Sequence, residues 1–313
     1  IRACTPETVR VRFRKKEAVF FYPRGKREEL LTMAERLYNV WKNPDKLLEY
    51  RLDSLKKRLI SLLSINGSSG RERGIRRRLY ETLKGKTDWL EIDAYGNLLG
   101  QVNCGKGPVI LLSAHMNTVR PFPAQRVILD DGRAFRSSNG ILGADDRAGI
   151  AVVLEILDFI RYSIFQGTLK IAFTVEEEIG CLGAKNMDKD FLEDVDAAIV
   201  VDRKGNRDVV VSYADMVPFC AEDYGRIFEK AGELAGMPDW RITAGGSSDA
   251  RVFAEHGIPS VNLSVGYHNP HTEDEMLDYR ATLETVLLLE KVLDEQLIRE
   301  EVLTSSRLLL KEI

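Results

Sequence analysis

The sequence predicts an α/β fold: a mixed, mainly parallel sheet sandwiched between helices. Three observations lead to this prediction. Short runs rich in Val and Ile alternate with helical stretches over most of the chain, which is typical of parallel strands joined by crossover helices. Some of these runs, such as "PVILLSAHM", are apolar at nearly every position, as in a sheet buried on both faces. The chain has 313 residues, 44% of them hydrophobic, and so can bury a sizeable core.

Two regions are expected along the chain. Residues 1–64 are predicted to form an extension of strands and helices, and residues 65–313 to form the main α/β domain. Apolar and basic residues alternate over the first 25 or so positions, which is typical of exposed strands. From Arg27 to about Ser64 the apolar period is helical, with a break at Asn43-Pro44.

The main domain begins with a hairpin that turns at Tyr95-Gly96-Asn97. Strands and helices then alternate. The predicted strands are "PVILLSAHM", "GTLKIAFTVEEE", "AAIVVDR", "DVVVSYA" and "IPSVNLSVGY". The predicted helices are "DRAGIAVVLEILDFIRYS", "AEDYGRIFEKAGELAG", "SSDARVFAEHG" and one long final helix from about Asp278 past Glu300.

Composition argues against several classes of protein. A net charge of −3 provides no basic field for nucleic acid or anionic lipid, and no apolar run approaches the roughly 20 residues of a membrane helix. The four cysteines are scattered, which argues against both a disulfide framework and a cysteine zinc site. The N-terminus lacks the layout of a signal peptide. We therefore expect a cytoplasmic protein that binds neither nucleic acid nor membrane.

Potential metal ligands occur at the ends of the predicted strands and in one glycine-bounded turn. Any one of them alone would more often be a helix cap or a surface group. Together they are better explained by a shared site, because loops at strand ends meet at one edge of an α/β sheet. Imidazole and carboxylate ligands suit zinc or a similar divalent ion. These residues are His115, Asp145, Asp146, Glu177, Glu178, Asp202 and His271.

A set of ordered motifs resembles a known family. The strings are "SAHMNTV", "GILGADDRAGIA", "FTVEEEIGCLGA", "VVD", "GGSSDARVFAEHGIPSVNL" and "YHNPHTEDE", and they span about Asp88 to Tyr279. Their order is similar to that in the co-catalytic di-zinc exopeptidases. This group includes peptidase T, the glutamyl and deblocking aminopeptidases, and the compact bacterial leucyl aminopeptidases.

The resemblance implies roles for individual residues. It implies that Asp145 bridges two zinc ions, with cobalt or manganese as substitutes, and that the Asp145–Asp146 peptide is cis. His115 and Asp202 would complete one metal site, while Glu178 and His271 would complete the other. Glu177 would act as the general base.

The chemistry of the residues agrees with these roles. Two divalent ions about 3.5–4 Å apart require a bridging carboxylate, and they lower the pKa of a shared water. An outer carboxylate such as Glu177 can take the proton of that water. Adjacent residues of a strand point to opposite sides, so Glu177 and Glu178 can both face the ions only where the backbone bends. We expect that bend near Gly180, with Glu176 pointing away.

The sequence departs from the family pattern at Asn117, where an Asp usually follows the histidine by two positions. Asn117 is expected to accept the second hydrogen bond of the imidazole without supplying a charge. Changes to such outer contacts typically cost ~10–100-fold in metal affinity or activity.

Several neighbouring residues keep two interpretations. His268 is an alternative to His271 as ligand. Tyr267 either donates a hydrogen bond to the oxyanion or only packs. Asp249 and Arg251 lie near the site by resemblance, although the segment from Ser247 to Asp249 equally suits a helix N-cap.

The extra lid or dimerisation domain of larger relatives is missing. The segments 116–144 and 203–270 are both too short to hold one. We therefore expect a compact exopeptidase, most simply an aminopeptidase that removes the N-terminal residue of short peptides. The alternatives are a dipeptidase, a carboxypeptidase, an N-acyl amino acid deacylase, or a metal-binding protein without activity. The expected partners are a peptide substrate and further copies of the chain in a homo-oligomer.

Overall fold

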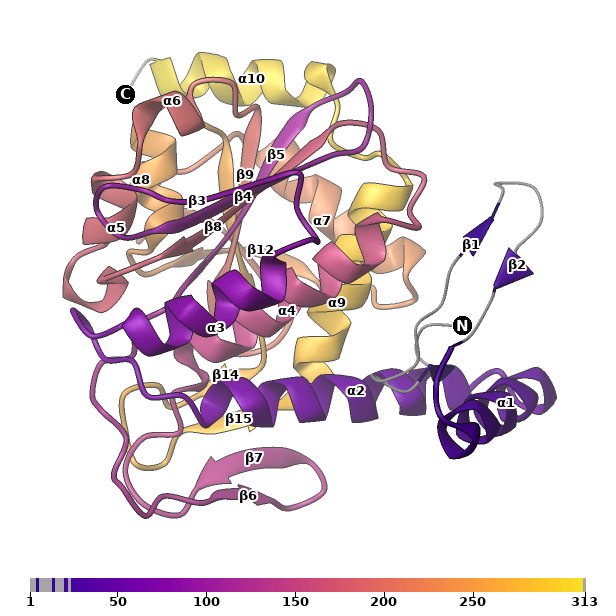
Figure 1. Ribbon diagram of the computed structural model, residues 1–313. Helices are drawn as coiled ribbons and strands as arrows, with labels where there is room; N and C mark the ends of the chain where they lie inside the picture. Colours follow the sequence, from indigo (N-terminus) through magenta and orange to yellow (C-terminus); the bar gives the residue numbers. More distant parts are fainter. Residues whose placement is uncertain (1–3, 6–12, 15–19, 22–23, 312–313) are drawn as a thin grey trace. The chain divides into compact units, whose positions relative to one another are not determined.

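The computed structural model describes residues 4–5, 13–14, 20–21 and 24–311 (Figure 1). The chain divides into two compact units, Ile1–Arg58 and Leu59–Ile313. The sequence places the boundary at residue 64 instead. That residues 1–64 form an extension separate from the main α/β domain stays a prediction.

The first unit contains a small hairpin, one whole helix and the first part of a second helix. Strand β1 (Phe13–Arg14) pairs antiparallel with β2 (Phe20–Phe21), and the rest of the expected basic strand lies outside the described residues. Helix α1 (Arg27–Lys42) ends just before the expected break at Asn43-Pro44, and α2 (Lys46–Leu63) follows. Glu29 caps the start of α1, because its carboxylate accepts a hydrogen bond from the Lys26 N–H at 2.8 Å.

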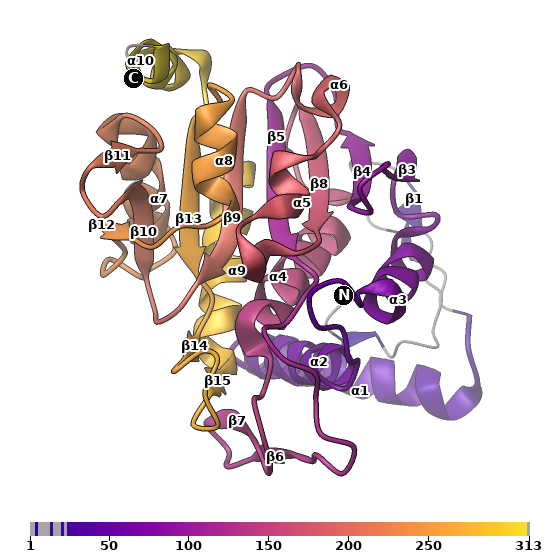
Figure 2. The ribbon, with the colours of Figure 1, turned by 90° about the vertical axis from the view of Figure 1, so that its left-hand side faces the viewer.

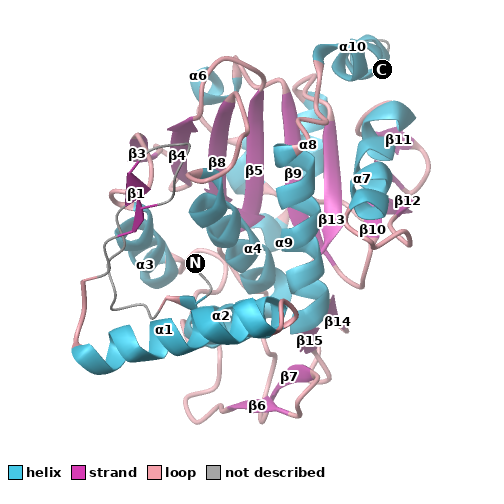
Figure 3. Ribbon diagram, turned by 90° about the vertical axis from the view of Figure 1, so that its right-hand side faces the viewer, coloured by secondary structure: helices cyan, strands magenta, loops and turns pink. Residues whose placement is uncertain are grey.

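The second unit is built on a nine-stranded mixed sheet, which confirms the predicted fold class. Its order is β11-β10-β13-β9-β5-β8-β4-β3, with β12 beside β10 (Figures 2 and 3). The central strands β13, β9, β5 and β8 are parallel to one another. The strands are β3 (Trp89–Ile92), β4 (Leu98–Asn103), β5 (Val109–His115), β8 (Thr168–Thr174), β9 (Ala197–Arg203), β10 (Asp208–Tyr213), β11 (Val217–Pro218), β12 (Arg241–Gly245) and β13 (Ser260–Ser264).

Helices cover both faces of this sheet. Helices α4, α7 and α9 lie on one face and α5, α6 and α8 on the other (Figures 2 and 3). Among the residues that the structure describes, no helix is both long enough and apolar enough to span a membrane. The helices are α3 (Arg73–Leu83), α4 (Ala144–Ile160), α5 (Leu182–Lys185), α6 (Lys189–Leu192), α7 (Glu222–Leu234), α8 (Asp249–Glu255), α9 (Tyr279–Asp294) and α10 (Glu300–Lys311).

The core lies on both faces of β5. Leu111 belongs to a buried apolar cluster with Phe191 of α6 and Phe253 of α8. The neighbouring Leu112 points to the opposite face, where helix α4 contributes the buried Ile150 and Val153. This apolar layer holds β5 and α4 together, so it also fixes the polar residues at the end of the strand and at the start of the helix.

A small second sheet was not anticipated. Its order is β14-β15-β7-β6, and its strands are β14 (Tyr267–His268), β15 (Met276–Asp278), β7 (Ala134–Ser137) and β6 (Ile128–Asp130). The segment between β5 and α4, all of it described, contains only the β6–β7 hairpin as regular structure. The chain is therefore the compact form that its segment lengths predict.

The prediction of a single long C-terminal helix is wrong, because α9 ends at Asp294 and α10 starts at Glu300. Gln296 adopts a left-handed conformation with φ 47°. The N–H of Leu297 bonds to the carbonyl of Val292, and that of Gln296 to the carbonyl of Leu293, both at 3.1 Å. This is a Schellman cap with Gln where Gly is usual, so no glycine signals the break in the sequence.

Candidate active site

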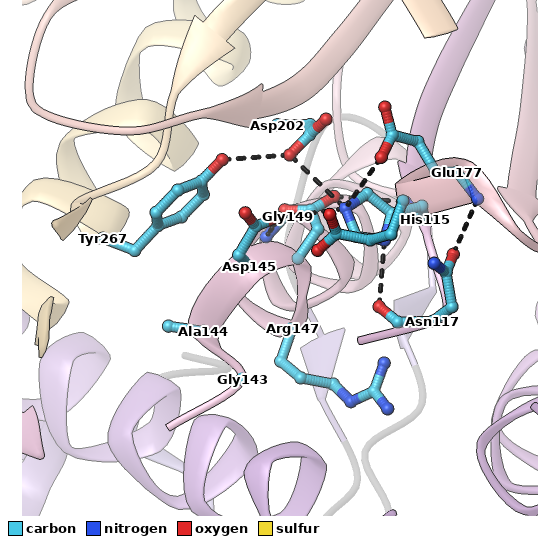
Figure 4. A network of polar contacts seen from close by, with 12 residues as sticks. His115, Asn117, Gly143, Ala144, Asp145, Arg147, Gly149, Glu177, Asp202 and Tyr267 are labelled. Carbon is cyan, nitrogen blue, oxygen red and sulfur yellow. Dashed lines mark hydrogen bonds and ion pairs between the residues drawn. The ribbon is translucent and has the colours of Figure 1, made fainter. Parts of the chain in front are cut away.

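Six of the predicted ligands and acids meet at the carboxyl ends of β5, β8 and β9. Strand β5 lies between β8 and β9 and is parallel to both, so the three strands end on the same edge of the sheet. Figure 4 shows four of these side chains converging. Ligand atoms of His115, Asp145 and Glu178 lie within 4.8 Å of one another, as do those of His115, Glu177 and Asp202.

Asp145 lies at the centre of the cluster. One carboxylate oxygen is 3.0 Å from Nε2 of His115, and the other is 3.1 Å from Nε2 of His271. Burial alone would raise the pKa of Asp145, but its hydrogen bonds with the two histidines lower it well below the ordinary value. One carboxylate thus faces both halves of the cluster, which is the arrangement that a bridging ligand requires.

The other acids divide between the two histidines. Asp202 is 3.6 Å and Glu177 3.9 Å from Nε2 of His115, while Glu178 is 2.8 Å from Nε2 of His271. Burial and the charge of Asp145 raise the pKa of Asp202 to about 7, although His115 opposes this rise. Hydrogen bonds to Asp145 and Glu178 raise the pKa of His271 to about 10. Two imidazoles and four carboxylates fit a pair of divalent cations, which would take the place of the histidine protons.

The turn after β8 aims two adjacent acids at the cluster. The strand ends at Thr174, and Glu177–Ile179 form one turn of 3₁₀ helix. Glu176 precedes this turn with a φ of 54°, so the expected bend begins there, before Gly180. The carboxylate of Glu176 points away and accepts a hydrogen bond from the Tyr95 hydroxyl at 2.8 Å.

The sequence predicts that the Asn117 side chain accepts a hydrogen bond from the imidazole of His115. This prediction is wrong. Nδ1 of His115 is 3.0 Å from the backbone carbonyl of Asn117 (Figure 4). The side-chain oxygen instead accepts a hydrogen bond from the Glu177 N–H at 3.0 Å, and the side-chain amide donates to Ser69 at 3.0 Å. Asn117 therefore positions the Glu177 turn, and any residue at this position offers a carbonyl to the histidine.

Asp146 and Tyr267 contact the cluster from outside. The Asp145–Asp146 peptide is cis, and Asp146 accepts hydrogen bonds from the backbone N–H groups of His115 at 3.2 Å and Gly149 at 3.0 Å. The Tyr267 hydroxyl donates to Asp202 at 3.0 Å. Its proton is thus directed at a ligand candidate.

Of the three remaining predicted residues, one lies next to the cluster and two do not belong to it. Asp249 is buried and accepts a hydrogen bond from the Thr174 hydroxyl at 2.6 Å, next to the cluster. Arg251 instead pairs with Glu255 at 2.9 Å. His268 pairs in register with Met276 in the small sheet. Neither Arg251 nor His268 belongs to the groups of close ligand atoms found among the described residues.

Glu275 is a site residue that the sequence analysis missed. Its buried carboxylate accepts hydrogen bonds from the N–H groups of Gly143 (2.8 Å), Ala144 (2.8 Å) and Asp145 (3.1 Å). Burial raises its pKa to about 7, and these N–H groups oppose the rise. Glu275 follows His271 by four positions, so it ties the His271 loop to the Asp145 turn. In the sequence it is one of three consecutive acids, "EDE", and resembles surface charge.

Several solved structures with the same fold are described as peptidases. Aminopeptidase PepT from Bacillus cereus superimposes with a TM-score of 0.70 at 19% identity, covering 78% of this chain and 98% of that one. The TET1 peptidase of Pyrococcus horikoshii superimposes with a TM-score of 0.64 at 19% identity, covering 77% and 99%. At such identities the likeness shows the fold.

Sequence comparison finds relatives at low identity or over a short segment of the chain. Protein YqjE of Bacillus subtilis is 24% identical over 59% of this chain and 80% of its own length. Peptidase T of Escherichia fergusonii is 34% identical over 29% of this chain, but that match covers only 21% of peptidase T. The signature of the M42 glutamyl aminopeptidase family matches residues 124–288, which is more than half of the chain. The chain therefore belongs to the M42 glutamyl aminopeptidase family and is a metal-dependent exopeptidase of the aminopeptidase type.

Proposed function

We propose that the protein removes the N-terminal residue of short peptides and that it uses two divalent ions, preferably zinc. The observation that carries this proposal is the position of Asp145, whose two carboxylate oxygens face His115 and His271 at 3.0 and 3.1 Å. A carboxylate between two imidazoles is suited to bridge two cations and to offset their mutual repulsion.

The remaining ligands divide into two sets. His115 and Asp202 would complete one site, with the Tyr267 hydroxyl orienting Asp202. Glu178 and His271 would complete the other. Cobalt and manganese could occupy the same nitrogen and oxygen ligands, so zinc is the preference of the ligand set and not its only match.

Glu177 is the proposed general base. Bound ions would lower the pKa of a shared water and polarise the scissile carbonyl. One oxygen of Glu177 is 3.9 Å from Nε2 of His115, so this carboxylate lies beside the position that an ion on His115 would occupy. From there it can accept the water proton and pass it to the leaving amine. Asn117 keeps the Glu177 turn in place through the backbone N–H of Glu177.

A peptide mixture tests the reaction. We would incubate the zinc- or cobalt-loaded protein with free peptides and with N-acetylated copies, and follow both by mass spectrometry. Ladders that lose N-terminal residues only in the free set are the expected result, and they would also reveal the side-chain preference. Trimming from the carboxyl end, cleavage of dipeptides alone or loss of acetyl groups would favour the other exopeptidase or deacylase activities. Two intact mixtures would favour a metal-binding protein without activity.

We also propose that the chain forms a homo-oligomer. The TET1 peptidase of Pyrococcus horikoshii, which shares the fold, can assemble into a tetrahedron or a large octahedral shell. Light scattering on the protein as it elutes from a size-exclusion column would measure the mass of the assembly directly. A mass of one chain at micromolar concentration would contradict the proposal.

A further inference from the structure

A second group of potential ligands lies behind the proposed base. Ligand atoms of Glu177, Cys181 and Asp249 lie within 4.8 Å of one another. Cys181 is 4% exposed and Asp249 is 2% exposed. The thiol is 3.4 Å from Oε1 of Glu177, whereas Oε2 of Glu177 faces His115 at 3.9 Å. Glu177 therefore presents one oxygen to each of two neighbouring sites.

Asp249 provides an independent sign that this group takes a ligand. Its Oδ2 accepts the Thr174 hydrogen bond, but its Oδ1 is buried and has no hydrogen-bond partner among the described residues. An unpaired buried carboxylate oxygen is costly, because it has lost water and gained nothing in return. A cation bound to Oδ1 would remove that cost.

The local backbone brings the sulfur to the carboxylate. Cys181 follows Glu177 by four residues, and its N–H bonds to the Glu177 carbonyl at 2.7 Å. This hydrogen bond closes the turn at Glu177–Ile179 and brings position 181 back beside Glu177. Cys181 also adopts a left-handed φ of 56°, which starts helix α5 immediately after it.

We propose that Glu177, Cys181 and Asp249 form a third cation site, which takes a thiophilic divalent ion such as zinc in excess or cadmium. The sulfur and one oxygen from each carboxylate bind the ion, and the thiol proton leaves to solvent. A thiolate ligand selects such ions over magnesium or calcium. A cation on Oε1 withdraws charge from the Glu177 carboxylate and slows hydrolysis, a consequence that rests on the proposed role of Glu177 as base.

Cadmium titration tests the site without any activity assay. The six residues of the main cluster contain no sulfur, so a thiolate-to-cadmium absorption band in the ultraviolet reports a cysteine ligand. We expect the band when metal-stripped protein is titrated with cadmium, and we expect it to disappear in Cys181→Ser. Cys220→Ser changes another buried cysteine and should retain the band. No band in the wild type, or a band that survives Cys181→Ser, would overturn the proposal.

Asp249→Asn provides a second variant in case Cys181→Ser fails to fold. It keeps the shape of the side chain but removes the charge. We expect the cadmium concentration that gives half of the maximal absorbance to rise about tenfold or more, as for other changes around a metal. An unchanged titration would contradict a role for Asp249.

Zinc inhibition tests the consequence separately. Initial rates of the wild type should fall about tenfold as free zinc rises beyond the amount that fills the main cluster, and a zinc buffer should restore them. The ratio of rates at low and high zinc should be closer to one in Cys181→Ser. Equal inhibition of both proteins would overturn the inhibitory role. If no protein hydrolyses peptides, the proposed function fails, whereas the cadmium band still decides whether the third site exists.

Discussion

The two histidines of the cluster are held very differently. The side chain of His115 is 1% exposed, and its second ring nitrogen bonds to the Asn117 carbonyl. The side chain of His271 is 43% exposed and belongs to a loop residue with a φ of 67°. Both imidazoles nevertheless contact the same carboxylate of Asp145 at nearly the same distance.

This difference indicates that the two proposed ions differ in how tightly they are held and in how open they are to substrate. The His115 half lies at the end of a core strand and is fixed by buried contacts. The His271 half opens to solvent, where a peptide can approach. We therefore expect the ion on His115 to bind more tightly and to exchange more slowly than the ion on His271.

Asp145→Asn should have the largest effect, because it removes the charge that the two halves share. We expect loss of both ions and a fall in peptide hydrolysis greater than the ~100-fold that outer contacts control. Elemental analysis after dialysis, together with initial rates, measures both. Two retained ions would show that Asp145 is not the bridge and would break the comparison.

His115→Ala and His271→Ala test the inequality of the halves directly. His271→Ala should retain about one tightly bound ion, while His115→Ala should lose the tighter one. His115→Ala should also lower the free energy of unfolding by about 1–3 kcal/mol, because it leaves buried acids without their partner. Metal content and chemical denaturation are the measurements. Equal metal loss and equal destabilisation in the two variants would remove the distinction.

Glu275→Gln should weaken both halves, since Glu275 connects the His271 loop to the Asp145 turn. The amide keeps one acceptor oxygen but cannot accept from all three N–H groups. We expect metal affinity to fall ~10–100-fold. Glu273→Gln is the matched control, because Glu273 is an exposed acid two positions earlier in the chain. If the two variants bind metal alike, Glu275 has no positioning role.

Acidification should release metal from the open half. The pKa of His271 is raised to about 10, so in the metal-free protein this residue is protonated at neutral pH. Metal binding must displace that proton, so affinity rises with pH and falls about tenfold per unit of acidification for each proton displaced. Competition with a chelator at pH 6, 7 and 8 measures the slope. An affinity independent of pH would contradict histidine ligation.

Asn117→Asp should have the smallest effect. The carboxylate can still accept the Glu177 N–H, and the backbone carbonyl at this position still holds His115. The carboxylate cannot donate to Ser69 as the amide does, but the Ser69 hydroxyl can donate to the carboxylate instead. We therefore expect hydrolysis within about tenfold of the wild type, the low end for outer contacts. A gain of 100-fold would show that the imidazole lacks a charge which the carboxylate restores.

The sequence predicted the sheet and the six clustered residues because strand ends in an α/β fold share one edge. It could not predict which oxygen of Asn117 faces His115, since both belong to one residue. It also missed Glu275, whose carboxylate binds backbone N–H groups more than 100 positions earlier in the chain. The start of the bend at Glu176 and the break after α9 at Gln296 could not be predicted either. Both residues have a positive φ, and neither is a residue type that signals one.

The most direct test of the account is Glu177→Gln, with metal content and peptide hydrolysis measured on the same preparation. The substitution keeps the shape of the side chain but removes its capacity to take a proton. Glu176→Gln changes the neighbouring acid that points away, and it should behave as wild type. We predict that Glu177→Gln retains two ions while hydrolysis falls by about 10²–10⁴-fold. Wild-type hydrolysis by Glu177→Gln would contradict the assignment of the base, and with it the proposed mechanism.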